Sequence, residues 1–166
     1  MDKDFSALLE NAQNLPDIFE IVKDAVWLIE RKSCGGLMLG TANLGNHPDA
    51  FFGAFYPIGS NIIVINEIPL QRIREINPAL YKPYIFHVQL HEYLHTLGYF
   101  SENAVRTKVI EITEATFGVE HLATLIARNS KRFFSNLVYP SSYWQPKELK
   151  IKLIEGFGRS SATYFS

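Results

Sequence analysis

The stretch PYIFHVQLHEYLHTLG, residues 83–98, decides most of what this chain can be. Its proline stands where the first turn of a helix tolerates one, and its final glycine stands where a helix stop is expected. Between them, apolar residues such as Ile85, Val88 and Leu94 supply the face that buries such a helix. The sequence therefore predicts one helix of about four turns from Tyr84 to Leu97.

Inside this helix lies the motif His91-Glu92-Tyr93-Leu94-His95, or HExxH. Residues four apart share one helical face, so the imidazoles of His91 and His95 can reach the same metal ion. Glu92 lies one step around the helix, where it can contact a metal-bound water. Zinc lowers the pKa of such a water to about 7, and Glu92 can take its proton and deliver it to the leaving amine of a peptide. A chance pentapeptide is disfavoured because the motif falls inside a predicted helix preceded by strands.

The composition restricts which ligands and partners are available. The chain has 166 residues, 16 Lys+Arg, 17 Asp+Glu and a formal charge of −1, so we expect no nucleic acid and no membrane as partner. A single cysteine, Cys34, excludes an internal disulfide and a thiolate zinc cluster, which leaves His, Asp and Glu as metal ligands. The start of the chain has no basic segment followed by an apolar stretch, and no apolar run spans a bilayer. We therefore expect a cytoplasmic protein.

The rest of the chain predicts a single α+β domain over residues 1–166. We expect four successive parts: a helical N-terminus at 1–31, a sheet at 36–66, the metal-site helices at 83–129 and a C-terminal extension at 131–166.

Within these parts the element boundaries follow from turn residues and apolar spacing. A small twisted sheet of about three strands is expected at Gly36–Leu44, Ala50–Tyr56 and Asn61–Asn66. Three further helices are expected at Ser101–Phe117, where Ser101 is a good N-cap, at Val119–Asn129 and at Pro146–Glu155.

After the motif the chain continues Thr96-Leu97-Gly98-Tyr99-Phe100-Ser101-Glu102. With HExxH this resembles the zincin metallopeptidases, most closely the minimal zincins, whose signature continues to a glycine and then an acidic pair. Gly98 matches that glycine, and Glu102 matches the second acidic position. Ser101, a poor zinc ligand, stands where metzincin-like members have their third ligand. The resemblance implies a zincin-like α+β fold, a bound Zn²⁺ and hydrolysis of peptide bonds.

The resemblance also implies that an extended peptide binds along an edge strand above the metal helix. Asn61–Asn66 is the candidate for that strand. Its unbroken apolar run favours an internal position instead, in which case Gly36–Leu44 or Ala50–Tyr56 takes the edge.

Three residues are candidates for a third metal ligand. Glu114 has a spacing from His95 that resembles the gluzincins, His121 is the only later histidine, and Glu102 has the minimal-zincin position. On a helical wheel of residues 102–117, Glu102 lies between two apolar arcs and Glu114 lies on the polar face. We rank Glu102 first, although a charge in the first helical turn also favours the helix dipole without any metal.

Two other residues have weaker claims. His87 continues the line of His91 one turn earlier, and we expect a partly buried structural histidine there rather than a ligand. Arg106 would pair with Glu102 and orient it if it faces inward, while a surface ion pair is the alternative.

We therefore predict a zinc-dependent metallopeptidase that acts on a peptide or protein substrate. His91, His95 and Glu102 bind Zn²⁺, and Glu92 is general base and then general acid. The alternative function is a non-catalytic zincin-fold module that binds a peptide or protein, and Ser101 keeps it open. A purely structural zinc site is disfavoured because such sites close with four protein ligands. No sequence feature indicates an oligomeric state.

Overall fold

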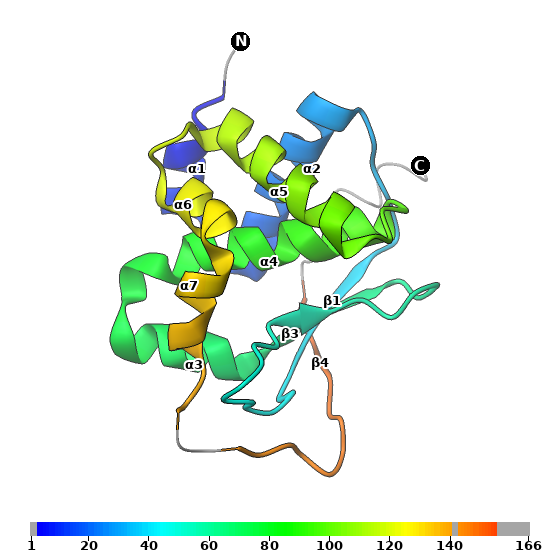
Figure 1. The fold of residues 1–166 in the computed structure, drawn as a ribbon. Coiled ribbons are helices and arrows are strands. Elements are labelled where there is room, and N and C mark those ends of the chain that lie inside the picture. The colour runs from blue at the N-terminus through cyan, green and yellow to red at the C-terminus, as the bar shows by residue number, and fades with distance from the viewer. Residues whose placement is uncertain (1–2, 141–142, 156–166) are drawn as a thin grey trace.

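The computed structural model describes residues 3–140 and 143–155, and over these ranges the chain is α+β, with seven α-helices and one mixed sheet of four strands (Figure 1). The helices are α1 (Phe5–Asn11), α2 (Leu15–Glu30), α3 (Glu67–Ile76), α4 (Tyr81–Thr96), α5 (Glu102–Phe117), α6 (Leu122–Arg128) and α7 (Ser130–Phe134). The strands are β1 (Met38–Ala42), β2 (Ala54–Phe55), β3 (Ile62–Asn66) and β4 (Lys152–Leu153). None of the helices in this described part has the length and apolar composition needed to cross a membrane.

The sheet has the order β2-β3-β1-β4, with β1 and β3 parallel and the two outer strands antiparallel to their neighbours. β3 is therefore an internal strand, so of the two positions left open for Asn61–Asn66 the internal one, which its apolar run favoured, is correct. The reason is its side chains: Ile63, Val64 and Ile65 are fully buried, as in a strand covered on both faces. The edge near α4 belongs to β2, so the alternative assignment to Ala50–Tyr56 is correct, although only two of its residues pair.

The predicted helix over Pro146–Glu155 is wrong, because this segment is extended and contributes β4. Gly40 of β1 explains how β4 can pair with β1. A Cβ atom at Gly40 would lie 2.5 Å from the Ile151 side chain, next to β4. Without that atom the backbones approach, and Ile154 N donates to the Leu39 carbonyl oxygen at 2.9 Å. The final part of the predicted C-terminal extension, residues 156–166, lies outside the described residues.

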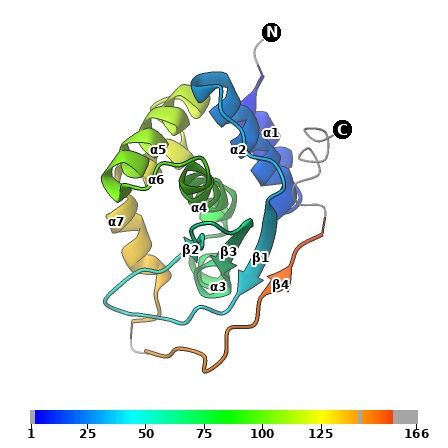
Figure 2. The same cartoon turned by 90° about the vertical axis from the view of Figure 1, so that its right-hand side faces the viewer.

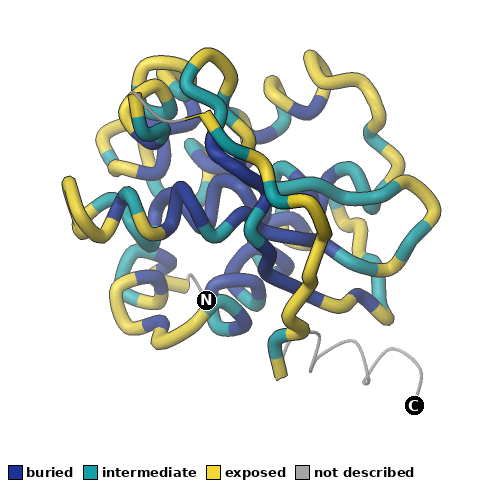
Figure 3. Tube along the Cα trace, turned by 90° about the horizontal axis from the view of Figure 1, so that it is seen from below, coloured by how far each residue is buried: buried dark blue, intermediate teal, exposed yellow. Residues whose placement is uncertain are grey.

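Helix α4 runs through the centre of the molecule. In Figure 2 it is seen nearly end-on, with α1 and α2 on one side, α5, α6 and α7 on the other, and the strands below it. Buried segments gather around this centre, and exposed segments lie outside (Figure 3). The helix predicted over 84–97 is present and begins earlier, at Tyr81, while α6 is shorter than predicted. Since helices and strands pack around most of α4, the buried polar side chains of His87, Gln89 and Glu92 need a specific reason to lie there.

The short edge strand β2 is held by the side chain of Asn66, which is 1% exposed. Its Oδ1 accepts from Leu44 N at 3.0 Å and from Ile68 N at 3.2 Å. Its Nδ2 donates to the carbonyl oxygens of Gly45 at 3.1 Å and Phe52 at 2.7 Å. Asn66 thereby caps α3 and fixes the loop that leads into β2.

Candidate metal centre

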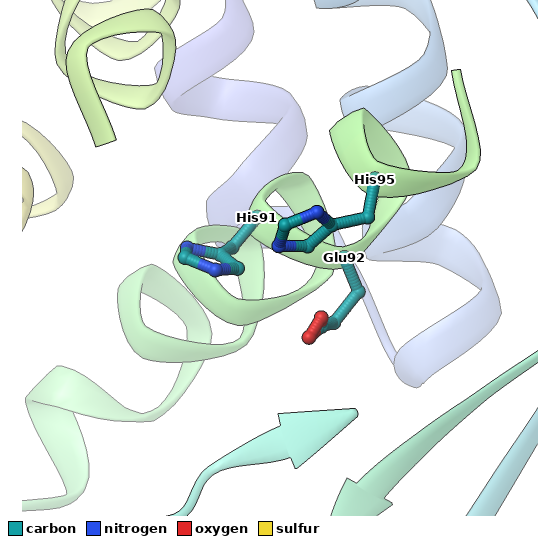
Figure 4. Close-up of side chains that lie close together, drawn as sticks. All are labelled: His91, Glu92 and His95. Carbon is teal, nitrogen blue, oxygen red and sulfur yellow. The ribbon is translucent and has the colours of Figure 1, made fainter. Parts of the chain in front are cut away.

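Three side chains of the HExxH motif converge at the C-terminal end of α4. Ligand atoms of His91, Glu92 and His95 all lie within 4.8 Å of one another. Figure 4 shows both imidazole rings on the same side of the helix, with the Glu92 carboxylate beneath them and directed toward the strands. The i, i+4 spacing therefore has the geometric effect expected from the sequence.

Glu102 reaches the same place from the first turn of α5. Its Oε2 lies 3.1 Å from His91 Nε2, and its Oε1 lies 2.9 Å from His95 Nε2. Gly98, with φ +100°, turns the chain after α4 through a conformation that L side chains rarely adopt. Ser101 then caps α5 by accepting from Ala104 N at 3.3 Å. The structure thus brings Glu102 to the histidine pair and gives Ser101 a capping role.

The contact between His95 and Glu102 needs a proton or a metal ion between the two acceptor atoms. His95 Nδ1 lies 2.8 Å from the backbone oxygen of Tyr99, so Nδ1 carries the ring proton and donates it. The lone pair on Nε2 then faces a carboxylate oxygen at 2.9 Å. A proton on either group or a metal ion bound by both accounts for such a distance.

The donor set fits a zinc ion. Tetrahedral zinc with bonds of about 2.0–2.2 Å to nitrogen and oxygen places neighbouring donor atoms about 3.3 Å apart. The two N···O distances, 2.9 and 3.1 Å, are hydrogen-bond lengths, so the donor atoms reach that spacing by moving a few tenths of an ångström apart. Burial lowers the pKa of His91, which keeps its ring neutral and its nitrogen available as a ligand. The carbonyl of Tyr99 fixes the tautomer of His95 that a metal requires.

Glu92 has no structural task that accounts for its position. It is 7% exposed, and its Oε2 has no hydrogen-bond partner anywhere in residues 3–140 or 143–155. Burial, and secondly the charge of Glu102, raise the pKa of Glu92 to about 7. A carboxyl group with that pKa exchanges protons readily near neutral pH.

The other two candidate ligands lie elsewhere. Glu114 pairs with Arg128 of α6, and at about 1.5 Å per residue it lies about 18 Å along α5 from Glu102. His121 is the N-cap of α6: its Nδ1 accepts from Ala123 N at 3.0 Å, and its ring stacks on Phe117 at 4.4 Å. Neither side chain is brought to the histidine pair.

Arg106 and His87 line the walls beside the site. Neither alternative for Arg106, a pair with Glu102 or a surface ion pair, is found among the described residues; the guanidinium donates to Asn103 Oδ1 at 3.4 Å. His87 is more deeply buried than the partly buried histidine expected, and its ring meets Phe134 edge-on at 5.3 Å. Burial, and secondly the neighbouring His91, lower the pKa of His87 to about 3.

Because His87 is buried in its neutral form, we expect the free energy of unfolding of the metal-free protein to fall at acidic pH. An unfolded histidine titrates near pH 6.5, so between that pH and about 3 the unfolded state holds one proton more. The free energy of unfolding then falls by about 1.4 kcal/mol per pH unit as the pH decreases, or about 3 kcal/mol from pH 6.5 to 4.5. The raised pKa of Glu92 works in the opposite direction over pH 7 to 4.5. Glu92 is present in both wild type and His87→Phe, so its contribution cancels when the two proteins are compared.

The measurement is urea unfolding of both metal-free proteins at pH 7 and pH 4.5. We expect wild type to lose about 3 kcal/mol relative to His87→Phe over this interval. Parallel losses in the two proteins would show that His87 is protonated in the folded state.

A small cavity of about 190 Å³ opens beside the HExxH residues. Ala54 of β2 lines one side, while His87, His91 and Glu92 of α4 line the other. The rings of Phe51 and Phe134 close it, and a wider cleft of about 540 Å³ continues past His91. The sequence offered no signal for these two phenylalanines, because more than eighty residues separate them.

Comparison of the chain with protein-family models, with curated proteins and with solved structures found no match. What the site can do is therefore inferred from its own residues. These are two imidazoles and a carboxylate with converging donor atoms, next to a second, buried carboxylate that faces a cavity.

Proposed function

We propose that this protein is a zinc-dependent metallopeptidase with a zincin-like fold. The observation that carries the proposal is the convergence of three donor groups: the two oxygens of the Glu102 carboxylate lie 3.1 and 2.9 Å from the Nε2 atoms of His91 and His95. Two histidines and one carboxylate are a donor set of catalytic zinc sites, which leave one coordination position open.

The chain's own residues then divide the work. When bound, zinc supplies Lewis-acid chemistry and lowers the pKa of water to about 7. His91, His95 and Glu102 hold the ion, and the Tyr99 carbonyl keeps the His95 ring in the orientation that binding needs. Glu92 accepts a proton from the attacking water at its unpartnered Oε2 and then donates it to the amine nitrogen that leaves.

The peptide has a suitable place along β2. This strand ends the sheet, and its outer edge pairs with no other strand of the described chain. An extended peptide can add to such an edge through main-chain hydrogen bonds. Because Ala54 of β2 lines the same cavity as Glu92, a peptide bound there has a carbonyl group close to the Glu92 carboxylate.

Zinc content and activity of the wild-type chain test the proposal together. Protein purified without chelators should carry about one zinc per chain. Chelation should abolish cleavage of a mixed peptide pool, and added zinc should restore it. Failure to bind stoichiometric zinc when it is supplied at neutral pH would overturn the proposal.

Glu102 and Glu114 lie on the same helix, but we expect only Glu102 to affect zinc affinity. Loss of a residue that only orients a metal ligand weakens metal binding by about 10- to 100-fold. Glu102→Ala removes a donor atom itself, so it should weaken zinc binding by more than that. Glu114→Ala is the matched control; it breaks an ion pair with Arg128 and should leave zinc affinity unchanged. Competition with a chromogenic chelator measures both. Wild-type affinity in Glu102→Ala would mean that another residue completes the site.

A further inference from the structure

The 190 Å³ cavity beside Glu92 is walled by aromatic rings. Phe51 and Phe134 stack with centroids 4.3 Å apart. Behind them, Tyr84 meets both rings edge-on at 6.1 and 5.9 Å. His87 meets Phe134 edge-on and also lines the cavity. We call this space, bounded by Phe51, Ala54, His87 and Phe134, the ring pocket.

One polar group in its lining is unaccounted for. His87 is 6% exposed, and within the described residues its Nδ1 is enclosed without any hydrogen-bond partner. A buried N–H without an acceptor is rarer than a buried acceptor without a donor, so the ring proton belongs on the other nitrogen, Nε2. His87 can therefore meet a ligand in the ring pocket through an N–H donor at Nε2.

The size of the ring pocket fits one six-membered ring. An apolar cavity of about 150 Å³ holds a benzene molecule, and the ring pocket is somewhat larger at about 190 Å³. Aromatic walls favour a ring as guest because edge-to-face contacts with Phe51 and Phe134 are available. The extra volume leaves room for a small polar substituent on that ring.

Charge disfavours anionic guests. The charged side chains Asp49, Arg106 and Lys131 line the wider cleft and not the ring pocket. A negatively charged guest would lose its hydration in the ring pocket without gaining a partner of opposite charge. A negatively charged guest would also approach Glu92.

We propose that the ring pocket binds the side chain of the substrate residue next to the scissile bond and selects tyrosine, whose hydroxyl oxygen accepts a hydrogen bond from His87 Nε2. This inference rests on the proposed function for the position of the scissile bond. His87 is thus a specificity-determining residue, and its burial on α4 has a purpose beyond packing.

The experiment compares acetyl-Ala-Ala-Xaa-Ala-Ala-amide peptides in which Xaa is Tyr, Phe, Leu or Glu. Relative kcat/KM values come from competition in one tube, so the folded fraction of a variant cancels. Wild type should prefer Tyr to Phe by about tenfold, the size of one net hydrogen bond. His87→Phe should reduce the Tyr/Phe ratio to about 1, whereas His87→Gln, which keeps an N–H donor, should retain part of it. Lys131→Ala, at the rim of the wider cleft, is the control and should leave the ratio unchanged.

A binding measurement separates this inference from the proposed function. N-acetyl-tyrosinamide and N-acetyl-phenylalaninamide are titrated into the Glu92→Gln protein and followed by amide chemical shifts. Tighter binding of the tyrosine compound that depends on His87 supports the ring pocket even if no peptide is cleaved. Cleavage without a Tyr/Phe preference, or with a preference that survives His87→Phe, overturns the ring pocket and leaves the peptidase proposal standing. The absence of both binding and selective cleavage overturns it as well.

Discussion

Glu92→Gln should lower kcat for peptide hydrolysis by about 10³-fold while zinc content remains that of wild type. Glutamine keeps the shape of the side chain but accepts no proton from water and has none to give to a leaving amine. Glu92 Oε2 has no hydrogen-bond partner in the described chain, so the substitution breaks no bond that supports the fold. The loss therefore reports chemistry rather than folding.

The measurement is single-turnover cleavage together with zinc analysis of the same preparation. Glu111→Gln is the control, because Glu111 is an exposed glutamate on α5 and its charge is removed in the same way. We expect this control to change kcat less than twofold. If wild type and Glu92→Gln both bind zinc and cleave the peptide at the same slow rate, the activity belongs to a contaminant. Peptide binding by a zinc-loaded wild type that never cleaves would favour the non-catalytic binding module.

The parts of the site that were predictable from the sequence are those set by local geometry. His91 and His95 follow from the helical repeat alone. Glu102 follows from the wheel of its own helix, which directed it toward α4, and from Ser101 as the cap that starts that helix at Glu102. In each case the deciding spacing is shorter than a dozen residues, so no knowledge of distant partners is required.

Features that the sequence left open, missed or predicted wrongly are those that a distant partner decides. An apolar run such as Ile62–Asn66 suits an edge strand or an internal one, and only the arrival of β1 and β2 on its two sides distinguishes them. The segment Lys152–Leu153 pairs with a strand more than a hundred residues earlier, which overrides its local preference. The ring pocket is a third case, since Phe51 and Phe134 acquire a shared role only through the packed fold.

Asn66→Ala should lower the free energy of unfolding by about 4 kcal/mol. The substitution removes an acceptor from Leu44 N and Ile68 N and a donor from the Gly45 and Phe52 carbonyls. Buried backbone groups left without partners cost about 1–3 kcal/mol each, reduced where water enters. That is a large share of the about 5–15 kcal/mol by which domains are stable.

The local effect reaches the site through β2. Asn66 Nδ2 donates to the Phe52 carbonyl oxygen at 2.7 Å, and Asn66→Ala removes this bond. The backbone N of residue 66, which donates to the Gly53 carbonyl oxygen at 2.8 Å, is kept, so the loop before Ala54 loses one of its two anchors. Urea unfolding measures the global loss, and amide exchange at Ala54 measures the local one. Asn61→Ala is the control: its exposed amide donates to the Gly36 carbonyl at 3.3 Å, and its loss should cost under about 1 kcal/mol. Equal losses in the two variants would mean that water replaces the Asn66 amide. If Asn66→Ala instead keeps zinc bound while KM for peptides rises, the metal site belongs to α4 and α5 alone, and the peptide site depends on the edge strand.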